Sequence, residues 1–190
     1  MIKIIGGKYR SRVIATPDSR TVPTKNMVRE ALFSAVSFDL DGNTLDLFAG
    51  SGAVGIEALS RGAKKSYFVD TSNDAIKVIK SNLASLKEGN GIILDMDYLA
   101  ALEHLYKLGI SFSFIYIDPP YKDKEYYQNS IDMINKLSLL DNMGRIGIEY
   151  EGELELNLEG FSEVKYKKYG YTKLILLRKK YEKSNLSWLI

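Results

Sequence analysis

The 190-residue sequence has no cysteine, a single histidine and only four prolines. Without cysteine it can form neither a disulfide nor a thiolate metal site, so a reducing cytoplasm is the expected compartment. The histidine, His104, falls in an amphipathic stretch and is expected to be an ordinary surface residue. This argues against a histidine-activated nucleophile and a histidine-rich metal site. No apolar run is long enough to span a membrane, and the N-terminus lacks a signal-peptide pattern.

The net charge of +2 conceals an uneven distribution of charge along the chain. Residues 1–29 hold seven basic side chains and one acidic one, and residues 165–190 hold eight and one. The residues between them hold 11 basic and 22 acidic side chains. Basic ends on an acidic body are expected if the ends flank a polyanion such as nucleic acid. Two solvated tails would give the same pattern.

The N-terminal segment predicts a β-hairpin extension that covers residues 1–23. Ile2–Ile5 would form one strand and Tyr9–Ile14 the other, joined by two glycines. Alternation along the second strand would place Arg10 and Arg12 on one face. Two arginines on one face suit phosphate groups, although a solvated edge strand would look the same.

A glycine-rich turn follows the first strand of the main body. The buried strand predicted at residues 44–48 leads into Gly50, Gly52 and Gly55, which fit the G-x-G-x-x-G spacing between a strand and a helix. The spacing alone is a weak signal, because dinucleotide-binding proteins share it. Asp46 lies inside the strand, and a buried carboxylate there needs donors such as loop amides or a bound ammonium group.

Two further strands are each followed by an acid. Lys65–Val69 ends at Asp70, where a carboxylate that holds ribose hydroxyl groups is expected. The strand Gly91–Leu94 leads to Asp97, which can accept a hydrogen bond from an adenine amino group. Asp97 can equally serve only as the N-cap of the helix predicted at residues 98–108.

The strand Phe112–Ile117 ends at Asp118-Pro119-Pro120-Tyr121, which holds two of the four prolines. Proline fixes its own φ and pushes the preceding residue toward extended geometry, so this sequence predicts a rigid corner. A carboxylate, an outward carbonyl and an aromatic ring at one corner suit a flat base with an exocyclic amine. An ordinary turn after a strand is the alternative.

Strands alternate with helices along the chain, and a terminal hairpin follows. This order predicts an α/β, Rossmann-like, doubly wound sheet of seven mostly parallel strands with an antiparallel last strand. The carboxyl ends of parallel strands form one edge, so the acids and glycines should meet there. The remaining predicted segments are a helix at 25–38 with Thr24 as N-cap, a mobile lid at 122–127, a helix at 129–139, a strand at 145–150, a hairpin at 161–168 and 172–178, a methyltransferase-sized domain at 24–180 and a tail at 181–190.

The motifs around Asp46 to Gly52 and Asp118 to Tyr121 together resemble class I S-adenosylmethionine-dependent amino-methyltransferases. Asp46 before the glycines departs from the dehydrogenase pattern and fits this one. Two more stretches, residues 5–12 and 23–33, narrow the resemblance to the RsmD family, which methylates the exocyclic N2 amine of a guanine in 16S ribosomal RNA. The resemblance covers about residues 2–180.

The resemblance implies a role for each matching residue. Thr24 and the loop 46–52 would lie near the methionine part of the cofactor, Asp70 at the ribose and Asp97 at the adenine. Asp118, the Pro119 carbonyl and Tyr121 would hold the target base. The catalytic set is Asp118, Pro119, Pro120 and Tyr121. The cofactor-binding set is Thr24, Asp46, Phe48, Ala49, Gly50, Ser51, Gly52, Asp70, Thr71 and Asp97. The RNA-binding set is Lys8, Arg10, Arg12 and Arg29.

Two residues depart from the family pattern. Asn26 stands where an acid is common, and Tyr171 replaces the acid of the usual Gly-Asp-Thr before the last strand. The expected enzyme would be a cytoplasmic monomer that binds no metal or membrane and acts on ribosomal RNA, within an assembling small subunit. The alternatives are a methyltransferase for adenine N6 of DNA or RNA, or for protein glutamine, a nicotinamide-dependent dehydrogenase, and a non-catalytic RNA-binding protein.

Overall fold

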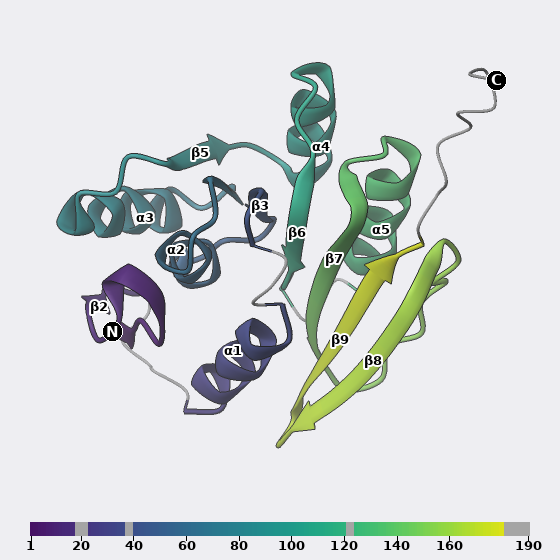
Figure 1. The fold of residues 1–190 in the computed structure, drawn as a ribbon, viewed down its shortest axis with the longest axis horizontal. Helices are drawn as coiled ribbons and strands as arrows, with labels where there is room; N and C mark the ends of the chain where they lie inside the picture. The colour runs from purple at the N-terminus through teal and green to yellow at the C-terminus, as the bar shows by residue number, and fades with distance from the viewer. Residues whose placement is uncertain (18–22, 37–39, 121–123, 181–190) are drawn as a thin grey trace, which may run out of the picture.

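The computed structural model describes residues 1–17, 23–36, 40–120 and 124–180, without the side chains of Pro23 and Thr24. Figure 1 shows a twisted sheet with helices on both faces and a short N-terminal segment beside α2. The strands of the main sheet are β3 (Asn43–Asp46), β4 (Lys65–Asp70), β5 (Gly91–Asp95), β6 (Phe112–Ile117), β7 (Leu140–Glu151), β8 (Phe161–Tyr169) and β9 (Thr172–Lys179). The helices are α1 (Pro23–Val36), α2 (Ala53–Ser60), α3 (Asn73–Leu86), α4 (Tyr98–Lys107) and α5 (Glu125–Lys136).

The seven described strands of this sheet lie in the order β5-β4-β3-β6-β7-β9-β8. The strands from β5 to β7 run parallel to one another, and β9 is antiparallel to both β7 and β8. The predicted Rossmann-like sheet with an antiparallel last strand is therefore confirmed. The chain moves outward from β3 to β5 and then returns to place β6 on the other side of β3. This change of direction puts a crevice at the carboxyl ends of β3 and β6.

Apolar side chains cover both faces of the sheet because neighbouring strand residues point to opposite sides. Ile115 and Ile117 of β6 pack with α4 and α5 on one face. Phe114 and Tyr116 pack with α1, α2 and α3 on the other. A strand buried on both faces reads as a continuous apolar run, which is why β6 was predicted with its observed bounds.

Several predicted boundaries were wrong. The first helix begins at Pro23, where a proline at the first helical position is favoured, so Thr24 is its second residue and not its N-cap. The fifth helix begins at Glu125 and buries Tyr127, which contradicts a lid for residues 125–127; residues 122–123 lie outside the described residues. β7 begins at Leu140 because the predicted turn before it is a bulge in the strand.

The N-terminal segment is not the predicted hairpin. Its strands are only Ile2–Lys3 (β1) and Val13–Ile14 (β2), which pair antiparallel. A short 3-10 helix, Gly7–Tyr9, lies between them, and Ser11 has a φ of +70°. Arg10 and Arg12 therefore stand in a turn, and the predicted strand that placed them on one face was wrong.

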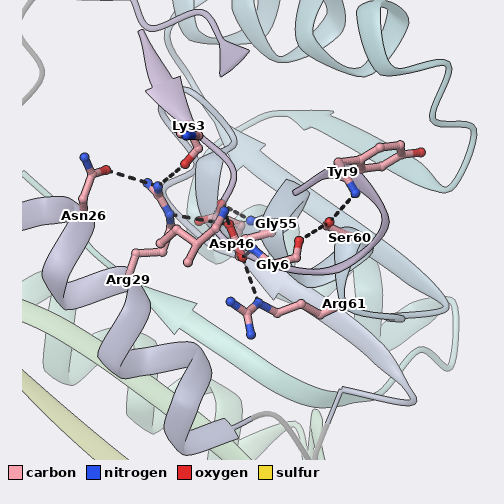
Figure 2. Close-up of polar contacts among 11 residues, drawn as sticks. Lys3, Gly6, Tyr9, Asn26, Arg29, Asp46, Gly55, Ser60 and Arg61 are labelled. Atoms are coloured by element: carbon pink, nitrogen blue, oxygen red, sulfur yellow. Dashed lines mark hydrogen bonds and ion pairs between the residues drawn. The ribbon is translucent and has the colours of Figure 1, made fainter. Parts of the chain in front are cut away.

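Partners elsewhere in the chain give this segment its shape. The buried Glu57 of α2 accepts hydrogen bonds from the amides of Ile5 and Gly6, each at 2.8 Å. Ser60 Oγ accepts from the amide of Tyr9 at 2.9 Å and donates to the Gly6 carbonyl (Figure 2). These amides are bonded to α2, so they are not available for pairing within a hairpin.

A second anchor joins the N-terminal segment to the glycine turn. The Asn82 side chain of α3 accepts from the Ala15 amide at 2.8 Å and donates to the Ala15 carbonyl at 3.0 Å. The same side-chain nitrogen also donates to the Ser51 carbonyl at 3.0 Å. One buried amide therefore holds the end of the segment and the turn after β3 together. No helix in the described part of the chain is both long and apolar enough to cross a membrane.

Candidate active site

A cavity of about 460 Å³ lies at the carboxyl ends of β3, β4 and β6. Its lining includes Gly50, Asp70, Asp97 and Asp118, which come from four different loops. A smaller cavity of about 150 Å³ adjoins it and shares Lys25, Phe48, Gly50 and Asp118. The predicted meeting of the acids and the glycine turn at this edge is confirmed. The side chain of Thr24, and Tyr121, lie outside the described part of the chain.

The three glycines of the turn do different things. Gly50 has a φ of +54°, and a Cβ added there would meet no protein atom within 4 Å, so this glycine faces open space in the cavity. Gly52 has a φ of +75°, and its added Cβ would lie 3.2 Å from Phe68 and Ile79. It lines neither cavity, so it serves the turn and the packing and does not touch the predicted cofactor site directly. Gly55 likewise allows close packing on Phe68.

Asp70 connects the ends of β3 and β4. Its Oδ2 atom accepts a hydrogen bond from the Gly50 amide at 2.8 Å, and its Oδ1 accepts from the Ser72 amide at 2.8 Å. Each carboxylate oxygen has a second lone pair, so the group can still accept hydrogen bonds from a ligand's hydroxyl groups. Thr71, also predicted to bind the cofactor, lines the main cavity beside it.

Asp97 combines both of the roles that were considered for it. It is the N-cap of α4, and its Oδ1 atom accepts from the Leu99 amide at 2.9 Å. It also lines the main cavity, and its side chain is exposed. Capping and a contact with a ligand are therefore compatible at this residue.

Asp46 is the most deeply buried acid of the site, at 2 % exposure. Its Oδ2 atom accepts from the Gly55 amide at 3.0 Å, as expected for a buried carboxylate (Figure 2). Burial raises its pKa from 3.8 to about 8; the Gly55 hydrogen bond opposes this shift, and the charges of Asp118 and Asp70 add to it. Asp46, Ala49 and Ser51 line the smaller cavity.

Replacing Asp46 by asparagine should stabilise the ligand-free protein at neutral pH. Because the folded-state pKa is raised, folding near pH 7 requires a proton that the unfolded chain has released. The stability that the acid contributes is fully present below about pH 4 and is lost as the pH rises to about 8, with a loss of about 1–4 kcal/mol near pH 7. Asparagine keeps an acceptor for the Gly55 amide. Thermal unfolding should show a gap between variant and wild type that widens over this range, and a constant gap would contradict the prediction.

The corner after β6 brings Asp118 to the rim of both cavities. Pro119 and Pro120 line the main cavity, and the Asp118 side chain is 19 % exposed. Lys25 Nζ lies 3.6 Å from Asp118 Oδ2. Burial raises the pKa of Asp118 to about 7; the charge of Glu149 adds to the shift and Lys25 opposes it. This carboxyl group can therefore change its charge near neutral pH.

Three aromatic rings form one wall of the main cavity. Phe48 was predicted to contact the cofactor, whereas Tyr98 of α4 and Tyr126 of α5 were missed. The Phe48 and Tyr126 rings stack with their planes 7° apart and their centres 6.1 Å apart, and the Tyr98 ring lies 5.0 Å from that of Tyr126. Such a wall offers a flat apolar face for a heterocyclic base. Tyr126 was missed because its segment was predicted as a lid.

Lys25 and Glu149 were also missed, and both line the smaller cavity. Glu149 stands in a strand in which acids alternate with apolar residues, a pattern that normally indicates a solvent-exposed face. It is instead 4 % exposed, because α1 covers that face of the sheet. Among the described residues, no three histidine or acidic side chains are grouped as metal ligands would be.

The four residues predicted to bind RNA are placed differently. Arg10 and Arg12 are exposed. Lys8 has a half-exposed side chain, and its ammonium group lies 2.7 Å from the Glu88 carboxylate. Arg29 is only 5 % exposed and donates from Nη2 to the Lys3 carbonyl at 2.8 Å (Figure 2). This burial contradicts a contact between Arg29 and RNA.

Asn26 and Arg29 explain how one departure from the family pattern is tolerated. Arg29 donates to Asn26 Oδ1 at 3.1 Å, and its Nε lies 3.8 Å from Glu57 Oε2. An amide oxygen at residue 26 thus still provides an acceptor for the guanidinium group. Tyr171, the other departure, lies in the turn between β8 and β9 and is 89 % exposed.

Known proteins resemble this chain over most of its length. A family model described as "Conserved hypothetical protein 95" matches residues 2–178. The Bacillus subtilis protein named "Putative rRNA methyltransferase YlbH" is 36 % identical over 158 residues, which make up 82 % of this chain and 85 % of that protein. The Escherichia coli "Ribosomal RNA small subunit methyltransferase D" is 34 % identical over 154 residues, or 80 % of this chain and 76 % of that protein.

A solved structure agrees with the sequence comparisons. The protein described as "Putative methyltransferase yhhF from Escherichia coli" superposes with a TM-score of 0.83 at 29 % identity, covering 95 % of this chain and 99 % of that one. The match includes both the glycine turn and the proline corner within residues 2–178. This chain therefore belongs to the RsmD family and is a methyltransferase.

Proposed function

We propose that this enzyme transfers a methyl group from S-adenosylmethionine to the exocyclic N2 amine of a guanine in 16S ribosomal RNA of the small subunit. The observation that carries the proposal is the position of Asp118 at the rim of a cavity that also contains Gly50 and Asp70. An acceptor for an amine thus adjoins a space suited to a nucleoside cofactor. The names of the family's relatives support ribosomal RNA as the substrate.

The residues of the main cavity fit S-adenosylmethionine. Gly50 leaves open space where any other side chain would project, so a ligand can approach the backbone closely. Asp70 has acceptor capacity for ribose hydroxyl groups and Asp97 for an adenine amine, beside a wall of Phe48 and Tyr98. The bound cofactor would supply an activated methyl group on a positively charged sulfur atom. The buried Asp46 and its loop would lie near the methionine part.

The corner after β6 would hold the target base. A guanine that leaves its stack could lie against Tyr121, with its amine donating to the Asp118 carboxylate and the Pro119 carbonyl. Two acceptors for two N–H donors fix the direction of the nitrogen lone pair. The contribution of the protein is then orientation and electrostatics, and no covalent intermediate with the enzyme is required.

Basic residues of the N-terminal segment would contact the RNA backbone. Lys8, Arg10 and Arg12 retain the exposure that phosphate contacts require, whereas Arg29 does not. Anchoring by Glu57 holds the segment in a fixed position beside the site. The proposal also implies a cytoplasmic enzyme that acts as a monomer, on ribosomal RNA within an assembling small subunit.

One assay tests the proposed function. The protein is incubated with radiolabelled S-adenosylmethionine and unmodified small-subunit RNA or particles, and the RNA is then digested to nucleosides. We expect the label in N2-methylguanosine. Label in N6-methyladenosine would support the alternative substrate, because adenine also presents a planar amine. Binding of RNA without binding of the cofactor would instead indicate a non-catalytic RNA-binding protein.

A further inference from the structure

Lys25 and Glu149 lie beside Asp118 and have no part in the function proposed above. Lys25 comes from the first turn of α1 and Glu149 from β7. The Lys25 Nζ atom lies 3.6 Å from Asp118 Oδ2 and 3.9 Å from Glu149 Oε1. One ammonium group therefore stands between two carboxylates, and all three side chains line the smaller cavity.

The burial of Glu149 is not explained by packing alone. Its Oε2 atom accepts a hydrogen bond from the Tyr116 hydroxyl. Its Oε1 atom is buried and finds no hydrogen-bond partner among the described residues, although the Lys25 ammonium group faces it. A buried carboxylate with an unsatisfied oxygen lowers stability, and glutamine would fill the same space without a charge. The charge itself therefore calls for an explanation at the site.

Charged and titratable groups reach Asp118 from four elements. Burial contributes most to its raised pKa, the Glu149 charge comes next, and Lys25 acts in the opposite direction. The groups that face it are Lys25 and Arg29 on α1, Asp46 on β3, Tyr116 on β6, and Glu149 and Glu151 on β7. Of these, Lys25 and Glu149 have opposite charges and are in contact with each other.

We propose that Lys25 and Glu149 are positioning residues that set the charge of Asp118 in opposite directions. The inference rests on the proposed function, in which Asp118 accepts the target amine. When the amine nitrogen bonds to the methyl carbon, the electron pair of the broken carbon–sulfur bond stays on sulfur and one N–H proton must leave the nitrogen. An ionised Asp118 can take that proton, whereas a protonated Asp118 cannot. Lys25 favours the ionised form and Glu149 the protonated form.

Two variants with opposite expected effects test the proposal. In Lys25→Met the pKa of Asp118 should rise by about one pH unit, and in Glu149→Gln it should fall by about the same amount. The pKa is measured by NMR titration of the ¹³C-labelled Asp118 carboxyl group in the free protein, with the signal assigned by its loss in Asp118→Asn. The acid limb of the kcat/KM profile for methyl transfer should move in the same two directions.

Matched controls separate charge from packing. Lys77→Met on α3 and Glu103→Gln on α4 change exposed side chains far along the chain from the site, and they should leave the titration unchanged. Thermal unfolding identifies any variant that has lost its fold, and Lys25→Arg should restore the wild-type limb. A purely structural role would lower stability without opposite shifts, so shifts in the same direction, or none, would overturn the proposal. The NMR titration needs no substrate, and therefore it remains informative even if the labelled-nucleoside assay fails.

Discussion

Replacing Asp118 by alanine should lower the rate of methyl transfer by about 10²–10⁴-fold, the range expected when a positioned acid–base group is removed. The carboxylate lies at the rim shared by both cavities, where it would accept from the target amine and take its proton. Asp70 and the glycine turn are untouched, so the affinity for S-adenosylmethionine should stay within a few-fold of wild type. Single-turnover assays and calorimetric titration measure the two quantities separately.

The variant should also remain folded. Burial raises the pKa of Asp118 to about 7, so the ionised carboxylate is not a stabilising group at neutral pH, and its removal should not lower the unfolding midpoint. Asp132→Ala provides a matched control, because this acid is exposed on α5 and lies outside both cavities of the site. Turnover within a few-fold of wild type in Asp118→Ala would refute the assigned role.

Replacing Glu57 by alanine should cause the largest loss of stability among the substitutions considered. Glu57 is fully buried and accepts from the amides of Ile5 and Gly6 and from Arg61 Nε, all at 2.8 Å. Its loss would leave the buried guanidinium group of Arg29 without its carboxylate. Removing one partner of a buried ion pair costs about 3–5 kcal/mol, which for this chain length corresponds to about 6–20 °C in Tm.

Two further variants test the cause of this loss. Glu103→Ala removes an exposed acid from α4 and should leave Tm within about 2 °C of wild type, as surface substitutions usually do. Adding Arg29→Met to Glu57→Ala removes the stranded charge and should recover part of the loss. Hydrogen exchange of the Ile5 and Gly6 amides should accelerate in Glu57→Ala. An unchanged Tm with protected amides would show that the anchor contributes little.

The central sheet could be predicted because its signals are local. β6 is apolar along its whole length, and the order of strands and helices fixed where the carboxyl ends would meet. Asp70 and Asp118 each follow such a strand directly, so their arrival at one cavity required no knowledge of distant contacts. Gly50 could be assigned to the turn, but the sequence could not distinguish it from Gly52, which packs on the core.

The incorrect predictions arose where a distant residue decides the local structure. Arg10 and Arg12 alternate as in a strand, yet Glu57 and Ser60 hold the neighbouring amides on α2. Glu149 alternates as on an exposed face, yet α1 covers it and brings Lys25 into contact. Periodicity describes only the segment in which it occurs, so it carries no information about either contact.

The double anchoring of the N-terminal segment has a consequence for how this enzyme can be rebuilt. Residues 1–17 are fixed by Glu57 of α2 and by Asn82 of α3, and Asn82 also holds the Ser51 carbonyl. A chimaera that takes this arm alone from a relative would mismatch both sockets and tilt the neighbouring turn. We expect that RNA preference can be grafted between relatives only when the arm travels together with α2 and α3, as one inherited block.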